Sequence, residues 1–241
     1  MSEARFQTFL NAAGHDPVLA RELYVWNRDL SVAFLADIAI LEVALRNSMH
    51  EAAAAVWGSH WYASINVPLD DRTSNNLNRA WGHLHASVRN RPDDPDVPGR
   101  LIAQCMFGFW TNLLDAGSYV GKEPRRYEVD YEALWLQAFK SAFPGGRAEA
   151  RAQRHTTSAS VPNFTREWTH SVCKTVNELR NRVAHHEPII NGFPLNGQRA
   201  RKSAAEGHDV CMTLARMIDR DLGKWLSMNS TVPGMLASRP C

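Results

Sequence analysis

The sequence predicts an all-α protein, a multi-helix bundle of six or seven helices that forms a single domain over residues 1–241. Apolar residues recur at steps of three and four from Ser31 to Val56 and again from Trp168 to Val183. Residues typical of helix caps precede several of these runs. A strand-like alternation of apolar and polar residues is not sustained for more than a few positions anywhere.

Three helices are expected in the first half of the chain. The first covers 31–56, and a second runs from about 71 to 89 with Asp70 or Asp71 as its cap. A connector rich in proline and aspartate, 90–99, follows it. The third helix, 100–116, is apolar nearly all round, so we expect it to be the most buried element.

The second half of the chain predicts three more helices. Asp130 caps a short helix that ends at Pro144, and 147–157 is either a helix or a mobile loop. Asn163 is expected to cap the clearest helix, which Pro188 stops because the residue before a proline is pushed out of the helical region. A capping box, Ser203 to Glu206, opens a last helix to about 226, and the tail from about 227 is expected to be flexible.

Composition excludes several classes of protein. The 241 residues are 44% hydrophobic, as in a globular protein, and 27 basic against 25 acidic residues leave no global charge that argues for nucleic acid. The longest apolar run, Val32 to Leu45, is interrupted by two acids and is shorter than the roughly 20 residues of a bilayer crossing, so we expect no membrane segment. The four cysteines are far apart, which argues against a zinc site or disulfide scaffold and fits a cytoplasmic protein.

Residues 177–188 concentrate the side chains that carry chemistry. They read Asn-Glu-Leu-Arg-Asn-Arg-Val-Ala-His-His-Glu-Pro, at the C-terminal end of an amphipathic helix. Histidine both takes and gives a proton near neutral pH, and the planar cation of arginine matches a phosphate. Such a pair is suited to cleaving a phosphodiester, and if the 2′-OH of RNA attacks, neither a metal nor a bound water is needed.

The run from Leu179 to Pro188 resembles the signature of the Abi-like proteins, bacterial abortive-infection proteins within the HEPN superfamily of helical nucleases. The superfamily motif is an arginine, usually a polar residue, and a histidine after four to six intervening positions. Arg180, Asn181 and His185 fit it with four residues between, and His186 fits with five. The resemblance is sharp over 176–191 and moderate over 24–57, where Leu41 to Asn47 is similar to the first long helix of these proteins.

The resemblance implies a specific function. Active members of the superfamily are α-helical, metal-independent endoribonucleases that use Arg and His, often as toxins or antiviral defence effectors. They usually form homodimers in which the two motifs face one cleft, while other members have lost catalysis. We therefore expect a hydrolase-type endoribonuclease with catalytic Arg180, Asn181, His185 and His186, no metal and no cofactor, that acts on RNA.

Helical geometry leaves the choice of histidine open. On an ideal helix Arg180 and His185 differ by roughly 140°, while Arg182 and His186 differ by only about 40°. Either the helix unwinds before Pro188 and frees His185, or each of two chains contributes to a composite site. We take His185 as the leading candidate, because the family spacing indicates it, and His186 as the reserve.

Other polar residues are candidates for substrate binding. These are Arg182 and Glu187 beside the motif and Arg46 and Asn47 on the first helix, where Glu42, Arg46 and His50 also fit an ordinary structural face. An Arg-rich set is expected to form a phosphate-binding rim or a solvated face: Arg147, Arg151, Arg154, Arg166, Arg199, Arg201 and Lys202. Asp93, Asp94 and Asp96 lie among prolines and fit a solvated turn better than a metal site.

Alternatives to the nuclease remain open. Arg180 and His185 are equally placed to cap the last carbonyls of their helix, where cations are favoured. The chain is then a non-catalytic helical module that binds a nucleotide, RNA or a partner protein. A third possibility is a toxin held inactive by an antitoxin.

Overall fold

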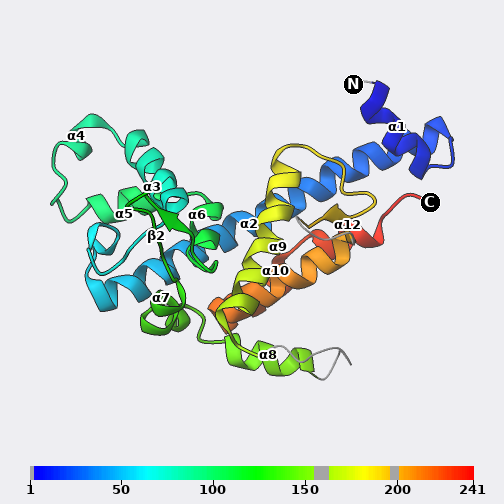
Figure 1. Ribbon diagram of the computed structural model, residues 1–241. Helices are drawn as coiled ribbons and strands as arrows, with labels where there is room; N and C mark the ends of the chain where they lie inside the picture. The colour runs from blue at the N-terminus through cyan, green and yellow to red at the C-terminus, as the bar shows by residue number, and fades with distance from the viewer. Residues whose placement is uncertain (1–2, 155–162, 196–200) are drawn as a thin grey trace. The chain divides into compact units, whose positions relative to one another are not determined.

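The computed structural model describes residues 3–154, 163–195 and 201–241 (Figure 1). It is mostly helical, with 68% of the chain in helix and few short strands. The all-α multi-helix fold class predicted from the sequence is therefore confirmed.

The described chain divides into two compact units. Unit 1 comprises residues 1–41, 174–216 and 220–241, and unit 2 comprises 42–173 and 217–219. Three helices have residues in both units: α2 (Pro17–Trp57), α9 (Arg166–Ala184) and α10 (Ala204–Ile218), the last with only its final two residues in unit 2. Most of unit 2 is thus one continuous stretch of chain, 42–173, between two segments of unit 1.

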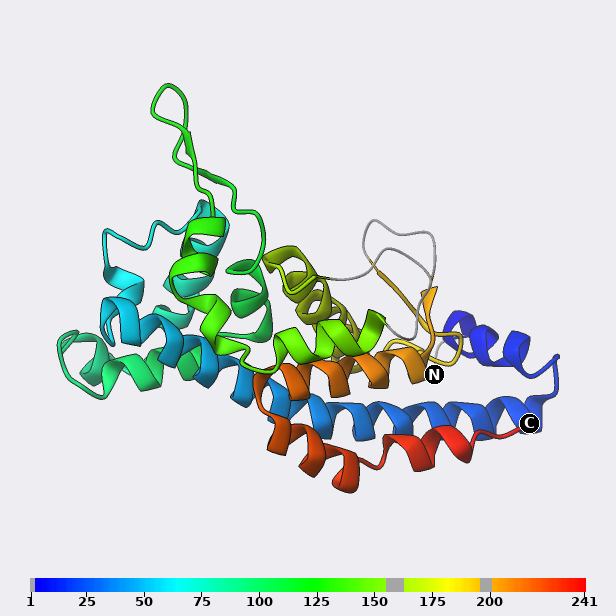
Figure 2. The same cartoon turned by 90° about the horizontal axis from the view of Figure 1, so that it is seen from below.

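Unit 1 is built on the N-terminal part of α2. Figure 2 shows α10 and α12 running along two sides of this part of α2. The indole N–H of Trp26 on α2 donates to the carbonyl of Met235 on α12 at 2.6 Å. Besides α2 and α9, the elements of unit 1 are α1 (Glu3–Ala12), β3 (Phe193–Pro194), β4 (Arg201–Lys202), α10 (Ala204–Ile218), α11 (Arg220–Asn229) and α12 (Val232–Ala237).

The core of unit 1 follows the predicted spacing on α9. Val172, Val176, Leu179 and Val183 are all buried, the first of them in the part of α9 that belongs to unit 2. On α2 the predicted stripe is only partly inside, since Ile38 and Leu41 are buried but Val32 is 61% exposed. The buried stripe instead runs through Leu23, Leu30 and Phe34, and Val32 lies on the opposite side of the helix.

Unit 2 is a set of short helices around aromatic side chains. Trp61, Trp110, Trp135 and Phe139 are buried together, with Trp61 near both Trp110 and Phe139. Trp110 and Trp135 therefore belong to the core of unit 2, whereas Trp225 of unit 1 is 47% exposed. The elements of unit 2 are η1 (Trp61–Ala63), α3 (Asp71–His83), α4 (Ala86–Arg89), α5 (Val97–Gln104), α6 (Phe107–Asn112), β1 (Tyr119–Val120), β2 (Tyr127–Glu128), α7 (Glu132–Gln137), η2 (Phe139–Ala142) and α8 (Gly146–Arg154).

Several predicted helices are divided in the structure. The helix expected over 100–116 is interrupted at Cys105, and α6 begins after Met106, where the Glu42 carboxylate accepts from the Phe107 N–H at 3.0 Å. The helix expected from 203 to 226 is interrupted at Asp219. At the start of α6, the Glu42 carboxylate bonds a backbone N–H that the interruption leaves without a partner in the helix. The apolar periodicity of the sequence does not reveal such an acceptor.

Two regions differ from the expected loops and tail. The antiparallel pair β1–β2 forms a hairpin that extends away from the helices of unit 2 (Figure 2). The tail expected from 227 instead completes α11 and forms α12, with Val232 buried. The segment after 146 is helical as far as Arg154, and the remainder of 147–157 lies outside the described residues.

The two predicted starts of the C-terminal helices have different outcomes. The capping box of α10 is present: the Glu206 carboxylate accepts from the Ser203 N–H at 2.7 Å, and Ser203 Oγ accepts from the Glu206 N–H at 3.2 Å. The predicted cap of α9, Asn163, is wrong by two residues. Thr165 caps the helix through its Oγ1, which accepts from the Trp168 N–H at 3.2 Å.

Candidate functional site

The C-terminal end of α9 is closed by a Schellman motif. The His185 N–H still bonds the Asn181 carbonyl at 2.9 Å, four residues back. The His186 N–H then bonds Val183 O at 3.1 Å, and the Glu187 N–H bonds Arg182 O at 2.9 Å. These two bonds are the pair that defines the motif, and Pro188 follows directly.

His186 occupies the left-handed position of this motif. Its φ is +57°, a conformation that usually belongs to glycine at the end of a helix. A side chain there costs about 1 kcal/mol relative to glycine, although His, Asn and Asp tolerate it better than other residues do. The side chain is retained there at a cost in stability, as it also is at His15, which follows α1 with a φ of +71°.

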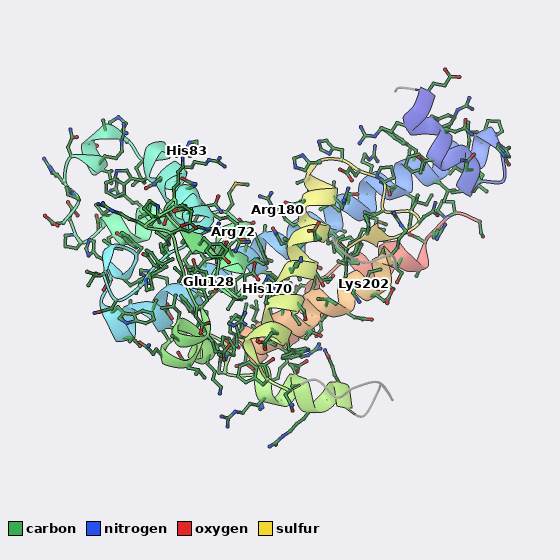
Figure 3. The ribbon with its side chains drawn as sticks, in the orientation of Figure 1. Arg72, His83, Glu128, His170, Arg180 and Lys202 are labelled. Atoms are coloured by element: carbon green, nitrogen blue, oxygen red, sulfur yellow. The ribbon has the colours of Figure 1, made fainter. Side chains whose placement is uncertain are left out.

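Arg180 and His185 lie on different faces of α9 in one chain. Because the His185 N–H completes the helical ladder, the helix does not unwind before this residue. His185 is exposed, Arg180 is half-buried, and the arc of about 140° between them stays in place. Figure 3 labels Arg180 on α9 and Lys202 near the start of α10. Of the two arrangements expected for His185, unwinding is therefore excluded.

Asn181, Arg182 and Glu187 complete the described motif. Asn181 is half-buried and supplies the carbonyl that holds His185. The Arg182 guanidinium donates to the Glu187 carboxylate across the end of the helix, in an ion pair of two half-buried side chains. The two residues expected to bind substrate are thus paired with each other, so the Glu187 carboxylate offsets the charge of Arg182.

A pocket of about 330 Å³ lies beside His186 in unit 1. His186 lines it together with Arg5 and Phe9 of α1 and Tyr24 and Arg28 of α2. The Arg5 guanidinium donates to the main-chain carbonyl of His186. His185 does not line this pocket, so the structure brings the second histidine, not the first, to a cavity with cations on its wall.

Sequence reasoning did not find Arg5, Tyr24 or Arg28. Arg5 lies 181 residues from His186 in the chain, so no local spacing links the two. Arg28 forms an exposed ion pair with Asp29 at 2.7 Å. The available signal was weak: the resemblance on the first long helix covers Tyr24 and Arg28 but marks neither of them.

The turn that follows the motif is anchored to α2 and β4. The Ile189 N–H donates to the side-chain oxygen of Asn27 at 2.9 Å, and Ile189 is buried. Arg201 donates to the carbonyls of Asn191 and Gly192 at 3.0 and 2.6 Å. Arg201, predicted for a phosphate-binding rim, therefore holds this turn together.

Arg46 and Asn47, the other predicted binding residues, belong to unit 2. Asn47 is exposed, and Arg46 is half-buried with its Nε enclosed. On the same part of α2, His50 Nδ1 accepts from the indole N–H of buried Trp61 at 3.0 Å. Burial lowers the pKa of His50, which favours the neutral form that this bond requires. His50 is therefore a packing residue, and a substrate role for Arg46 and Asn47 stays a prediction.

The basic and acidic clusters have different outcomes. Arg166 is buried, donates to Glu132 at 2.8 Å and to the Leu114 carbonyl at 3.0 Å, and thus has a structural role in unit 2 instead of lining a phosphate rim. Arg147 and Arg151 are exposed on α8, while the Arg154 side chain and Arg199 lie outside the described residues. Asp94 accepts from the Asp96 N–H at 3.0 Å, as in the predicted turn. Among the described residues no group of three His, Cys, Asp or Glu side chains is placed to hold a metal, and no helix has the length and apolarity to traverse a bilayer.

Comparison with known proteins does not identify a relative: no family model, no curated protein and no solved structure matches the chain. The resemblance to the Abi-like proteins therefore depends only on the sequence patterns over 176–191 and 24–57. The membership that this resemblance suggests stays a prediction.

Proposed function

We propose that the chain is a metal-independent endoribonuclease of the abortive-infection type. The observation that carries the proposal is the placement of His186. This residue has the left-handed conformation at the end of α9, at a cost in stability, and it lines a pocket that Arg5 and Arg28 also line. An imidazole and guanidinium groups at one cavity are the groups that RNA cleavage needs.

The reaction is a transesterification. The 2′-oxygen of one ribose bonds to the adjacent phosphorus as its proton passes to an imidazole, and the bond from phosphorus to the 5′-oxygen breaks. That oxygen takes a proton from an imidazolium. The products are a 2′,3′-cyclic phosphate and a 5′-hydroxyl, and a guanidinium stabilises the charge that develops on the phosphoryl oxygens.

In this proposal His186 and Arg5 act in the pocket of one chain. The other catalytic candidates, Arg180, Asn181 and His185, act near that pocket. Because Arg180 and His185 lie on different faces, both reach one phosphate only when a second copy supplies one of them. We include a homodimer in the proposal for this reason. Arg182 and Glu187 at the helix terminus are assigned to substrate binding, with the carboxylate in competition with phosphate for Arg182.

A stripe on α2 supports association with a second copy. Val18, Val25 and Val32 recur every seven residues and are 59%, 45% and 61% exposed. The three valines form one narrow apolar stripe on the helix surface, although the positions between them that would complete a coiled-coil seam are charged. Arg28, which lies between Val25 and Val32 in the chain, is already paired with Asp29 of the same helix, and Arg28 and Val32 both line the pocket beside His186.

A specific observation also favours a non-catalytic binding module. Arg5 is bonded to a main-chain carbonyl and Arg182 to a carboxylate, as in a helix terminus stabilised by cations. In this alternative, the motif binds RNA or a nucleotide without cleaving it. An antitoxin partner belongs only to the nuclease proposal, in which it would hold the enzyme inactive.

Incubation of the full chain with total RNA in excess EDTA tests the proposal. We expect cleavage with 2′,3′-cyclic phosphate ends, and loss of cleavage in a His185→Ala, His186→Ala double variant whose circular dichroism is unchanged. Salt-sensitive RNA binding without product would support the binding module and contradict the nuclease. Cleavage that EDTA abolishes would contradict the metal-independent mechanism.

A further inference from the structure

The pocket beside His186 has two chemically different sides. Its polar side consists of the Arg5 and Arg28 guanidinium groups and the His186 imidazole, and no described lining residue is acidic, although Arg28 is paired with Asp29 just outside the pocket. Its apolar side includes Phe9 and Val183, which are buried, and Leu35, which is half-buried. A ligand that fits both sides carries an anionic group attached to a flat or apolar body.

The size of the pocket restricts this ligand to one small unit. Its volume of about 330 Å³ is near the lower end of the range for small-molecule sites. A single nucleobase with its sugar is of this size, while a duplex or a folded peptide is not. The phosphate of such a unit would remain at the edge, where the cations lie.

Tyr24 provides an oriented aromatic ring in the pocket. The ring meets that of Phe9 edge to face, with 5.2 Å between centroids and 76° between planes, and Phe9 is itself buried. Tyr24 is nevertheless 37% exposed, so part of its surface is open to a ligand. Aromatic rings held in this way are the usual stacking platforms for unpaired bases.

Asn27 adds a hydrogen-bonding group to the same wall. Its side-chain oxygen accepts from the Ile189 N–H, which fixes the orientation of the amide. The group of Asn27 that remains for a ligand is its NH₂, a donor suited to the carbonyl or ring nitrogen of a base.

We propose that this pocket binds one unpaired nucleobase of the RNA strand, stacked on Tyr24, with the adjoining phosphate held at Arg5 and His186. The inference rests on the proposed ribonuclease function and specifies its substrate as single-stranded RNA. Binding of the base would select the linkage that reaches the imidazole, so that Tyr24 and Asn27 determine the nucleotide at the cleavage site.

A short single-stranded RNA with 2′-O-methyl substitution throughout, which cannot be cleaved by 2′-OH attack, serves as the probe for binding to the full chain. We expect Tyr24→Ala to weaken its binding about ten-fold, the effect of losing one stacked base, and Tyr24→Phe to retain most of it because the ring stays. Tyr127→Ala is the matched control, because Tyr127 is an exposed tyrosine of unit 2. Leu35→Trp, which fills the pocket without removing Tyr24, is expected to weaken binding as well.

Two outcomes separate this inference from the nuclease proposal. Wild-type RNA cleavage, together with unchanged binding and unchanged cleavage positions in both Tyr24→Ala and Leu35→Trp, overturns the base pocket alone. Loss of probe binding in both variants, without cleavage by the wild type, supports the pocket and overturns the nuclease. Nucleoside 5′-monophosphates are the last probe. If they bind as tightly as the oligonucleotide, and if Tyr24→Ala weakens the binding of the monophosphates but not that of the oligonucleotide, the ligand is a free nucleotide. The assignment of the pocket to RNA is then wrong.

Discussion

Arg5 on the first helix donates to the main-chain carbonyl of His186, although 181 residues separate the two in the chain. The carbonyl belongs to the residue that ends α9, where the helix dipole is negative and favours a cation. The bond places α1 over the strained turn and the imidazole beside the pocket. The integrity of the candidate site therefore depends on the N-terminal helix.

Replacement of Arg5 tests this dependence. We expect Arg5→Ala to lower the free energy of unfolding by about 0.5–1 kcal/mol, because the terminal carbonyls of α9 lose a cationic donor. Arg5→Lys keeps the charge and is expected to lose less. Urea unfolding measures both, and an Arg5→Ala variant as stable as the wild type would contradict the role of this bond.

His186→Gly is expected to stabilise the protein and to inactivate it. Glycine removes the left-handed strain at φ +57° and raises the free energy of unfolding by about 1 kcal/mol. The imidazole is lost at the same time, so RNA cleavage should fall. Ala184→Gly, two positions earlier at the last residue of α9, is the control and should destabilise. Equal destabilisation by both changes would show that His186 is not strained.

Glu187→Gln is expected to strengthen RNA binding. The substitution releases Arg182 from its carboxylate partner and removes one negative charge next to the motif. The expected gain in affinity at low salt is about two- to five-fold, the size of an exposed ion pair. Fluorescence anisotropy with an RNA oligonucleotide measures it. Weaker binding would instead assign Glu187 a direct part in holding the substrate.

A buried network in unit 1 predicts a pH dependence of stability. Ser230 Oγ donates to the Asp37 carboxylate at 2.6 Å and lies 3.3 Å from Nε2 of His208. Burial lowers the pKa of His208, although Asp37 and Asp209 oppose this shift, and burial raises the pKa of Asp37. The stability that neutral His208 contributes is complete above its ordinary pKa of 6.5 and is lost as the pH falls through the lowered value.

We therefore expect His208→Gln to lose less stability than the wild type between about pH 7.5 and about pH 5.

Asp37→Asn tests the dependence of stability on pH in the opposite direction. The stability that protonated Asp37 contributes is complete below its ordinary pKa of 3.8 and is lost as the pH rises through the raised value, so this variant should lose less on alkalinisation. Chemical unfolding across the pH range measures both, and parallel curves for the wild type and His208→Gln would contradict the assignment.

The sequence predicted the helix that carries the motif because its apolar stripe at Val176, Leu179 and Val183 is dictated by burial. It also predicted the capping box of α10, which is a local pattern of two side chains. The pocket could not be predicted, because it requires α1, α2 and the end of α9 to meet. Spacing alone favoured His185, since it does not reveal that the chain turns left-handed at His186.

The central claim is that an imidazole at the end of α9 transfers a proton during RNA cleavage without a metal. The most direct measurement is the single-turnover cleavage rate in EDTA for the wild type, His186→Asn, His185→Asn and the variant that carries both substitutions. Asparagine tolerates the left-handed conformation, so His186→Asn keeps the turn while it removes the proton-transfer group. We predict a loss of about 10²- to 10⁴-fold for His186→Asn. Undiminished cleavage by a variant that carries both substitutions, or no cleavage by the wild type, would contradict the account.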